Sequence, residues 1–105
     1  MRKKVLCVCA KGLSRSKYLA SYLRNKGYST RWGGVEGMNK RGKAPNHLTQ
    51  EDIEWADLVI ITRKRIRPKF DKQFKNRKNK IQLDVVDDGT MRANMRKAIK
   101  PYLPL

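Results

Sequence analysis

The sequence predicts an α/β fold: a single domain, residues 1–105, built on a four-stranded parallel sheet with helices on both faces. Short apolar runs of strand length alternate along the chain with segments whose apolar residues recur at helical spacing. The run DLVIIT at residues 57–62 is almost entirely apolar, as expected for a central parallel strand buried on both faces. Four strand–helix alternations in one chain of this length favour a parallel sheet in one domain.

The first half of the chain supplies two of the predicted strands and two of the helices. The first strand is the apolar run at residues 5–8, and the second covers residues 28–34 and ends on glycines. Gly27 provides the carboxyl-terminal stop of the intervening helix. Thr49 begins the second helix, with Asp52 three residues later in a capping-box arrangement. The apolar face of the first helix consists of Tyr18, Leu19, Tyr22 and Leu23.

The second half continues the alternation after the strand at residues 57–62. The segment from Arg63 to Lys80 is predicted to form an amphipathic helix, broken near Pro68. Residues 81–86 form the fourth strand, and Thr90 caps the last helix after a turn. The apolar face of the third helix is Ile66, Phe70 and Phe74, and that of the last helix is Met91, Met95, Ile99 and Tyr102.

The charge of the chain is strongly one-sided. Lysine and arginine number 26 against 9 acidic residues, which gives a formal net charge of +17. Such a charge favours polyanionic partners, and the segment from Arg63 to Lys80, with Asp71 as its one acidic residue, is the predicted surface for nucleic acid or another polyanion. The alternatives are an ordinary solvated helix face and a charge that serves solubility.

The remaining composition argues against several other classes of protein. No apolar run reaches transmembrane length, and the first one is too short for a signal peptide, so we expect a cytoplasmic protein without a membrane partner. Cys7 and Cys9 stand two residues apart on one strand, where a disulfide is unfavourable. Two cysteines and the single His47 are too few soft ligands for a metal site, and we expect no cofactor.

The loop after the first strand carries the chemistry. Cys9 is followed six positions later by Arg15 and then by Ser16, where a helix begins. Backbone N–H groups at a helix start attract anions, arginine offers two parallel donors to phosphate oxygens, and such a cradle favours the nucleophilic thiolate of cysteine. Ser16 can donate a hydrogen bond to that thiolate. The predicted phosphate-binding residues are Ala10, Lys11, Gly12, Leu13, Ser14, Arg15 and Ser16. The alternative is a buried strand cysteine followed by a basic surface turn.

This Cys-x5-Arg-Ser loop resembles the phosphate-binding loop of low-molecular-weight protein tyrosine phosphatases, at the extreme amino terminus as in that family. The resemblance spans nearly the whole chain, includes the strand at residues 57–62, and extends to a small subfamily of predicted phosphatases of this length. It implies a low-molecular-weight phosphatase-like fold, with Cys9 as nucleophile and Arg15 as the catalytic phosphate-binding arginine. Nothing after Cys9 is a cysteine, which argues against an arsenate reductase, because that chemistry passes a disulfide along.

A phosphatase of this kind also needs an acid for the leaving group. The candidates are Asp84, in the predicted last strand, and Asp87 and Asp88, in the turn after it. The resemblance favours Asp87 as the catalytic acid, with Asp88 second. The alternative for all three is turn formation and helix capping. Gly89 stands where relatives often carry the aromatic residue that lines the phosphotyrosyl slot, so the resemblance does not predict a preference for phosphotyrosine.

The sequence therefore predicts a metal-independent phosphomonoester hydrolase that forms a cysteinyl-phosphate intermediate and is similar to protein tyrosine phosphatases. Its expected substrate is a phosphorylated protein or another phosphomonoester. Two alternatives remain: a module that binds phosphate or nucleic acid on the same fold without turnover, and a phosphatase that acts on a nucleic-acid-associated substrate.

Overall fold

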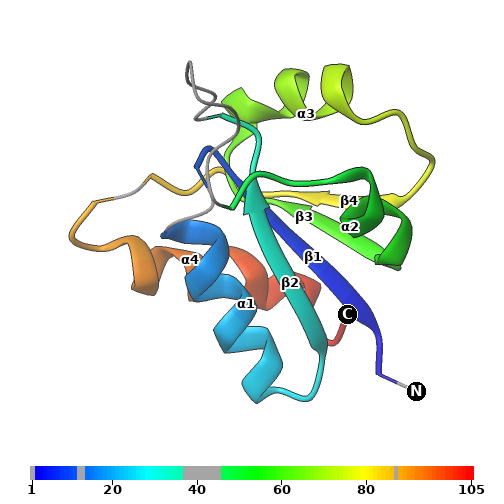
Figure 1. Ribbon diagram of the computed structural model, residues 1–105. Coiled ribbons are helices and arrows are strands. Elements are labelled where there is room, and N and C mark those ends of the chain that lie inside the picture. Colours follow the sequence, from blue (N-terminus) through cyan, green and yellow to red (C-terminus); the bar gives the residue numbers. More distant parts are fainter. Residues whose placement is uncertain (1, 12–13, 37–45, 87) are drawn as a thin grey trace.

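Four parallel strands form one sheet in the order β2-β1-β3-β4 (Figure 1). The computed structural model describes residues 2–11, 14–36, 46–86 and 88–105. The strands are β1 (Lys4–Cys9), β2 (Ser29–Gly34), β3 (Leu58–Ile61) and β4 (Asn79–Gln82). The predicted four-stranded parallel sheet is thus confirmed, and β1 and β3 are its inner strands.

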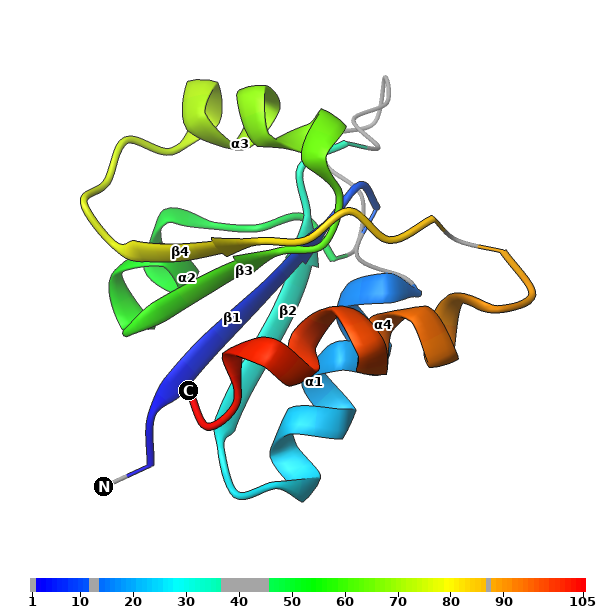
Figure 2. The ribbon, with the colours of Figure 1, turned by 180° about the vertical axis from the view of Figure 1, so that it is seen from behind.

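The helices lie on both faces of this sheet, as predicted. They are α1 (Arg15–Asn25), α2 (Gln50–Trp55), α3 (Arg67–Gln73) and α4 (Met91–Ile99), with short 3₁₀ segments η1 (Lys64–Ile66) and η2 (Lys100–Tyr102). Figures 1 and 2 show α1 and α4 on one side of the sheet and α2 and α3 on the other. None of the helices in the described ranges is long and apolar enough to cross a membrane.

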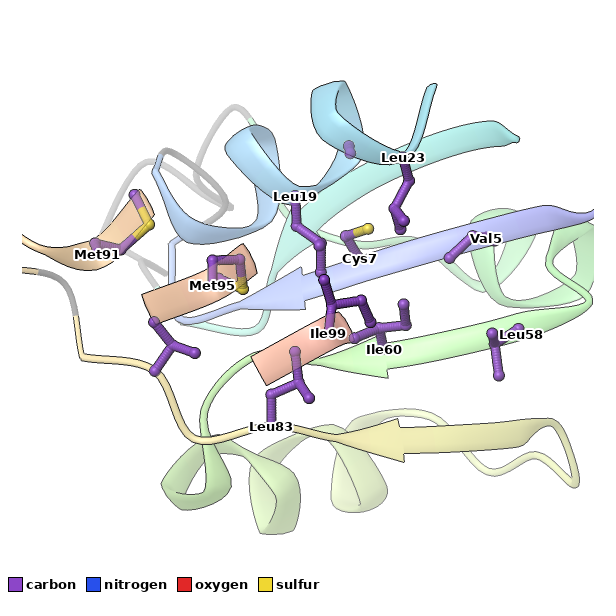
Figure 3. Close-up of a cluster of buried hydrophobic side chains, with 12 residues drawn as sticks. Val5, Cys7, Leu19, Leu23, Leu58, Ile60, Leu83, Met91, Met95 and Ile99 are labelled. Atoms are coloured by element: carbon purple, nitrogen blue, oxygen red, sulfur yellow. The ribbon is translucent and has the colours of Figure 1, made fainter. Parts of the chain in front are cut away.

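Strand β1 divides the core into two clusters because its side chains alternate between the faces. Val5 and Cys7 pack beneath α1 and α4 (Figure 3), whereas Leu6 and Val8 pack beneath α2 and α3. The first cluster also holds Leu19, Leu23, Met95 and Ile99, all fully buried. Burying one such side chain stabilises the fold by about 1.5–3 kcal/mol, so these faces fix where each helix lies.

The turn after α1 contains the glycine stop that the sequence predicts. Gly27 has a φ of +100°, a left-handed conformation that glycine adopts without strain. The N–H of Gly27 donates to the carbonyl of Arg24 over 3.0 Å, and the N–H of Tyr28 donates to that of Leu23 over 3.2 Å. These bonds satisfy the last carbonyls of α1 and direct the chain into β2.

Two predictions for the chain between β3 and the end of β4 need correction. The segment from Arg63 to Lys80 is not one helix: η1 and α3 end at Gln73, and Lys80 already belongs to β4. Pro68 lies in the first turn of α3, where proline is tolerated. Strand β4 begins two residues earlier than predicted and ends at Gln82, because an edge strand needs no continuous apolar run and its register is set by β3.

The predicted apolar face of the last helix is correct for Met91, Met95 and Ile99 but wrong for Tyr102. Helix α4 ends at Ile99, and Tyr102 lies in η2 with 46% of its surface exposed. A 3₁₀ segment has fewer residues per turn than an α-helix, so the helical spacing no longer carries Tyr102 to the buried side.

Candidate active site

The site predicted from the sequence lies at the carboxyl end of the central strand β1. Cys9 is the last residue of β1, and Arg15 is the first residue of α1. Strand β1 pairs with β2 on one side and with β3 on the other, so the order of strands along the chain reverses direction at β1. Ligands in open parallel sheets bind at such a switch point. Both chain termini lie toward the opposite end of the sheet (Figures 1 and 2).

The thiol of Cys9 contacts the hydroxyl of Ser16. The Sγ and Oγ atoms are 3.0 Å apart, Cys9 is 2% exposed and Ser16 is fully buried. If the sulfur is a thiolate, it has no hydrogen to donate, and the Ser16 hydroxyl becomes the donor. The fold therefore permits the hydrogen bond that the sequence suggests, whereas the catalytic role of either residue stays a prediction.

Arg15 carries a buried donor at this end of α1. Its Nε atom is buried and has no hydrogen-bond partner within the described ranges. A buried donor without an acceptor costs about 1–3 kcal/mol, and more when it is charged. An oxyanion held at the start of α1 would offer such an acceptor.

The two ends of the loop between β1 and α1 are anchored by backbone hydrogen bonds. The carbonyl of Ala10 accepts from the N–H groups of Val35 over 2.9 Å and Glu36 over 2.7 Å. At the other end the carbonyl of Ser14 accepts from the N–H of Tyr18 over 2.9 Å. Of the other predicted phosphate-binding residues, Lys11 is exposed, and Gly12 and Leu13 lie outside the described residues.

Thr62 is a structural residue near this site that sequence reasoning missed. It is fully buried just after β3, and its hydroxyl donates to the carbonyl of Val8 over 2.8 Å. Its own N–H donates to the same carbonyl over 2.9 Å. Thr62 thus fixes the chain directly before Cys9. The signal for it was the hydroxyl residue that closes an otherwise apolar strand.

The carboxylate of Glu36 links the loop anchor to the basic segment that follows β3. It accepts from Lys69 Nζ over 2.7 Å and from Arg65 Nη1 over 2.8 Å. These bonds, that of Lys69 foremost, hold the pKa of Glu36 below its ordinary value. Several cations between residues 63 and 80 are therefore already paired with carboxylates. The pairs are Arg63–Asp84, Arg65–Glu36, Arg67–Asp71 and Lys69–Glu36.

Two of the three candidate acids have partners in the fold. Asp84 accepts from the N–H of Lys64 over 3.2 Å and lies 3.5 Å from Nε of Arg63. Asp88 accepts from the hydroxyl and the N–H of Thr90 over 2.7 and 2.8 Å, and these bonds lower its pKa. Asp88 is therefore a turn residue, the alternative that the sequence left open. Asp84 instead links the chain after β4 to the segment that follows β3. Asp87, the preferred acid, lies outside the described residues.

The second cysteine differs from Cys9 in its surroundings. Cys7 is fully buried in the core beneath α1 and α4, and desolvation together with the nearby Cys9 raises the pKa of its thiol well above the ordinary value. Cys7 is therefore a packing residue. No cluster of three or more histidine, cysteine, aspartate or glutamate residues suited to a metal ion occurs in the described part of the chain.

Comparison with known proteins adds a structural relationship. No protein-family model matches the sequence, and no curated protein matches it. Among solved structures, the YwlE arginine phosphatase from Geobacillus stearothermophilus is 20% identical, with a TM-score of 0.70 over 93% of this chain and 86% of that one. The two proteins share a fold. The predicted phosphatase-like α/β fold is therefore confirmed.

A second solved structure is similar over nearly the full length. An Enzyme IIB subunit of a PTS system from Escherichia coli is 22% identical, with a TM-score of 0.49 over 97% of this chain and 92% of that one. The phosphatase-like fold rests on the first comparison alone.

Proposed function

We propose that the protein is a metal-independent phosphomonoester hydrolase that works through a cysteinyl-phosphate intermediate. The observation that carries the proposal is the contact of 3.0 Å between Cys9 Sγ and Ser16 Oγ, where Arg15 opens α1. In this proposal Cys9 is the nucleophile, Ser16 donates a hydrogen bond to it, and Arg15 is the cation that binds the phosphoryl group. The phosphatase-like fold supports the same proposal.

In the first step the Cys9 thiolate attacks phosphorus, and a sulfur–phosphorus bond forms as the bond to the leaving oxygen breaks. Ser16 stabilises the thiolate, and Arg15 and the N–H groups at the start of α1 bind the non-bridging phosphoryl oxygens. The leaving oxygen takes a proton from a carboxylic acid. In the second step water attacks the phosphorus and returns a proton to the carboxylate formed in the first step. The sulfur–phosphorus bond breaks, its electron pair stays on Cys9 as the thiolate, and phosphate is released.

Asp87 is the acid in this proposal. Two points support this assignment. The turn after the last strand resembles the one that carries the acid in low-molecular-weight phosphatases, and the other two candidate acids have partners elsewhere. Asp84 is engaged by Lys64 and Arg63, and the lowered pKa of Asp88 makes its protonated form scarcer.

The test is hydrolysis of an aryl phosphate in the presence of a metal chelator. We expect turnover by the natural protein and none by Cys9→Ser, which should still bind phosphate or vanadate. Cys7→Ser, the matched control, should retain turnover because Cys7 lies in the core away from the loop. Full activity of Cys9→Ser, or activity that the chelator abolishes, would contradict the proposal.

The substrate class can be tested by assaying several phosphorylated compounds side by side. Phosphotyrosine and other phosphomonoesters are the expected substrates. Since the YwlE structure is that of an arginine phosphatase, phosphoarginine is a further compound to assay. If none of these is hydrolysed while phosphate still binds at the loop, the protein is the phosphate-binding module without turnover. The net charge of +17 is the observation that favours this second candidate.

A further inference from the structure

The acidic residues of this protein are distributed unevenly over the two sides of the sheet. Residues 14–35 and 89–105, which contain α1 and α4, include no aspartate or glutamate. Every ion pair found among the described residues uses Arg31 or a cation between residues 63 and 69. Within those ranges, the cations of α1 and α4 other than Arg15 are exposed and make no described ion pair.

Two hollows lie along the line where α1 and α4 meet, which we call the α1–α4 seam. The first, about 450 Å³, lies between residues 14–21 and the start of α4, and the second, about 730 Å³, lies farther along both helices. Among the residues that the structure describes, no acidic side chain lines either hollow. The basic residues that line them are Lys17, Lys26, Arg92, Arg96, Lys97 and Lys100.

Two stacked tyrosines connect the hollows. Tyr18 lines the first hollow and Tyr22 the second. Their ring centroids are 6.3 Å apart, with an angle of 24° between the ring planes, and both residues are half-buried against the core. The seam thus combines fixed aromatic surfaces with a row of cations.

Three cations of the seam contact the tyrosines instead of carboxylates. Arg96 Nη1 donates to the Tyr18 hydroxyl over 2.9 Å, and the Arg92 guanidinium lies 5.5 Å from the centre of the Tyr18 ring. Lys26 Nζ lies 5.0 Å from the centre of the Tyr22 ring. Aromatic contacts hold these charges in place but do not neutralise them, so a polyanion on the seam would relieve their mutual repulsion.

We propose that the α1–α4 seam binds single-stranded nucleic acid. The lysines and arginines would contact phosphates, and Tyr18 and Tyr22 would stack on bases. Single strands fit better than an acidic peptide, which offers nothing to stack, and better than a duplex, whose bases are already paired and stacked. Sequence preference should be weak, because phosphate contacts and stacking do not read base edges.

The segment from Arg63 to Lys80 is the competing surface, since the sequence favoured it for the same ligand class. Four of its cations are already paired with carboxylates, as described above. Because Lys72, Lys75 and Arg77 are exposed there and make no described ion pair, they provide a control of equal charge on the other side of the sheet.

The experiment measures binding of a labelled oligothymidylate of about 12 nucleotides, a length within the usual range of single-strand sites. Salt is varied between about 50 and 200 mM. We compare the natural protein with the α4 triple variant Arg92→Gln, Arg96→Gln, Lys100→Gln and with the control Lys72→Gln, Lys75→Gln, Arg77→Gln. Loss of three phosphate contacts should flatten the log–log salt slope by about 2, at ~0.7 per contact on single strands. The control should keep the slope of the natural protein.

A second arm tests stacking. Tyr22→Leu should weaken oligothymidylate binding about tenfold or more, whereas Tyr22→Phe, which keeps the ring, should bind like the natural protein. Since Tyr22 packs against the core, each variant is first checked by thermal unfolding. The α4 triple variant changes only exposed side chains. If Tyr22→Leu does not fold, the salt slope of the α4 triple variant tests the proposal by itself.

Several outcomes would overturn the inference. One is that oligothymidylate does not bind at low salt. Another is that the control triple variant changes the salt slope as much as the α4 triple variant, or more. A third is that polyglutamate binds as tightly as oligothymidylate. The inference does not depend on the proposed phosphatase activity: the α4 triple should hydrolyse a small aryl phosphate like the natural protein. If neither the natural protein nor any variant hydrolyses the aryl phosphate, while the binding results are as expected, the proposed function is wrong and the inference about the seam stands.

Discussion

The Sγ atom of Cys9 lies 3.0 Å from the Oγ atom of Ser16, and both residues are buried at the junction of β1 and α1. A hydrogen bond to a charged group is worth about 1.5–3 kcal/mol. If Cys9 reacts as a thiolate, Ser16→Ala should slow turnover by about tenfold to a hundredfold. It should also slow the alkylation of Cys9 by iodoacetamide.

Ser21→Ala is the matched control, because Ser21 lies on the same helix but lines the α1–α4 seam instead of contacting Cys9. It should leave both the turnover and the alkylation rate unchanged. If Ser16→Ala and Ser21→Ala behave alike, the contact between Ser16 and Cys9 has no catalytic role.

Arg15→Lys tests whether the loop needs a guanidinium group or only a positive charge. Lysine cannot offer two parallel donors to a phosphoryl group. We therefore expect kcat/KM for an aryl phosphate to fall by about a hundredfold or more, the usual cost of losing one fixed donor to the transition state. Arg24→Lys, in the exposed last turn of the same helix, should have no effect. A loss below about tenfold, ~1.4 kcal/mol, would place the phosphoryl group elsewhere.

Asp87→Asn tests the proposed acid through the leaving group. An alkyl or phenyl phosphate needs its leaving oxygen protonated, whereas a nitrophenyl phosphate does not. Turnover of the poor leaving groups should therefore fall much more than that of nitrophenyl phosphate. Asp84→Asn and Asp88→Asn should show no such difference. If Asp88→Asn shows it and Asp87→Asn does not, the assignment is wrong by one residue.

The sequence predicted the sheet and the position of the Cys9 loop because both depend on local patterns. Apolar runs, the capping box at Thr49 and the turn at Gly27 each determine structure within a few residues. The boundaries of β4 and the exposure of Tyr102 depend on register and on a change of helix type, which have no such pattern. These predictions failed, as did that of a helix over residues 63–80.

Long-range polar contacts were the other part that the sequence did not reveal. Glu36 meets Arg65 and Lys69, about thirty positions away, only because the chain crosses the sheet between them. The charge run between residues 63 and 80 therefore suggests more unpaired cations than the fold contains. The α1–α4 seam shows the opposite case. Its cations are distant in the sequence, on two separate segments, and only the fold brings them together.

Glu36→Gln tests the ion pairs of Glu36 through the pH dependence of stability. The pKa of Glu36 is lowered in the folded protein, so its charged form contributes stability above the ordinary glutamate pKa of about 4.3. That contribution is lost as the pH falls through the lowered folded value. We expect Glu36→Gln to reduce the free energy of unfolding by about 0.5–1 kcal/mol near neutral pH, since both partners are partly exposed. The difference should vanish only at a pH well below that lowered folded value, where the glutamate is protonated in both states.

Urea unfolding of both proteins at neutral and acidic pH measures this difference directly. Glu51→Gln is the control, because the Glu51 side chain is 83% exposed and lies 3.9 Å from Arg31 at the limit of an ion pair. It should have no measurable effect at either pH. High salt should shrink the effect of Glu36→Gln, because partly exposed charges are screened. A difference that persists at acidic pH would mean that Glu36 stabilises the fold by packing and not by its charge, and the two ion pairs would then contribute nothing.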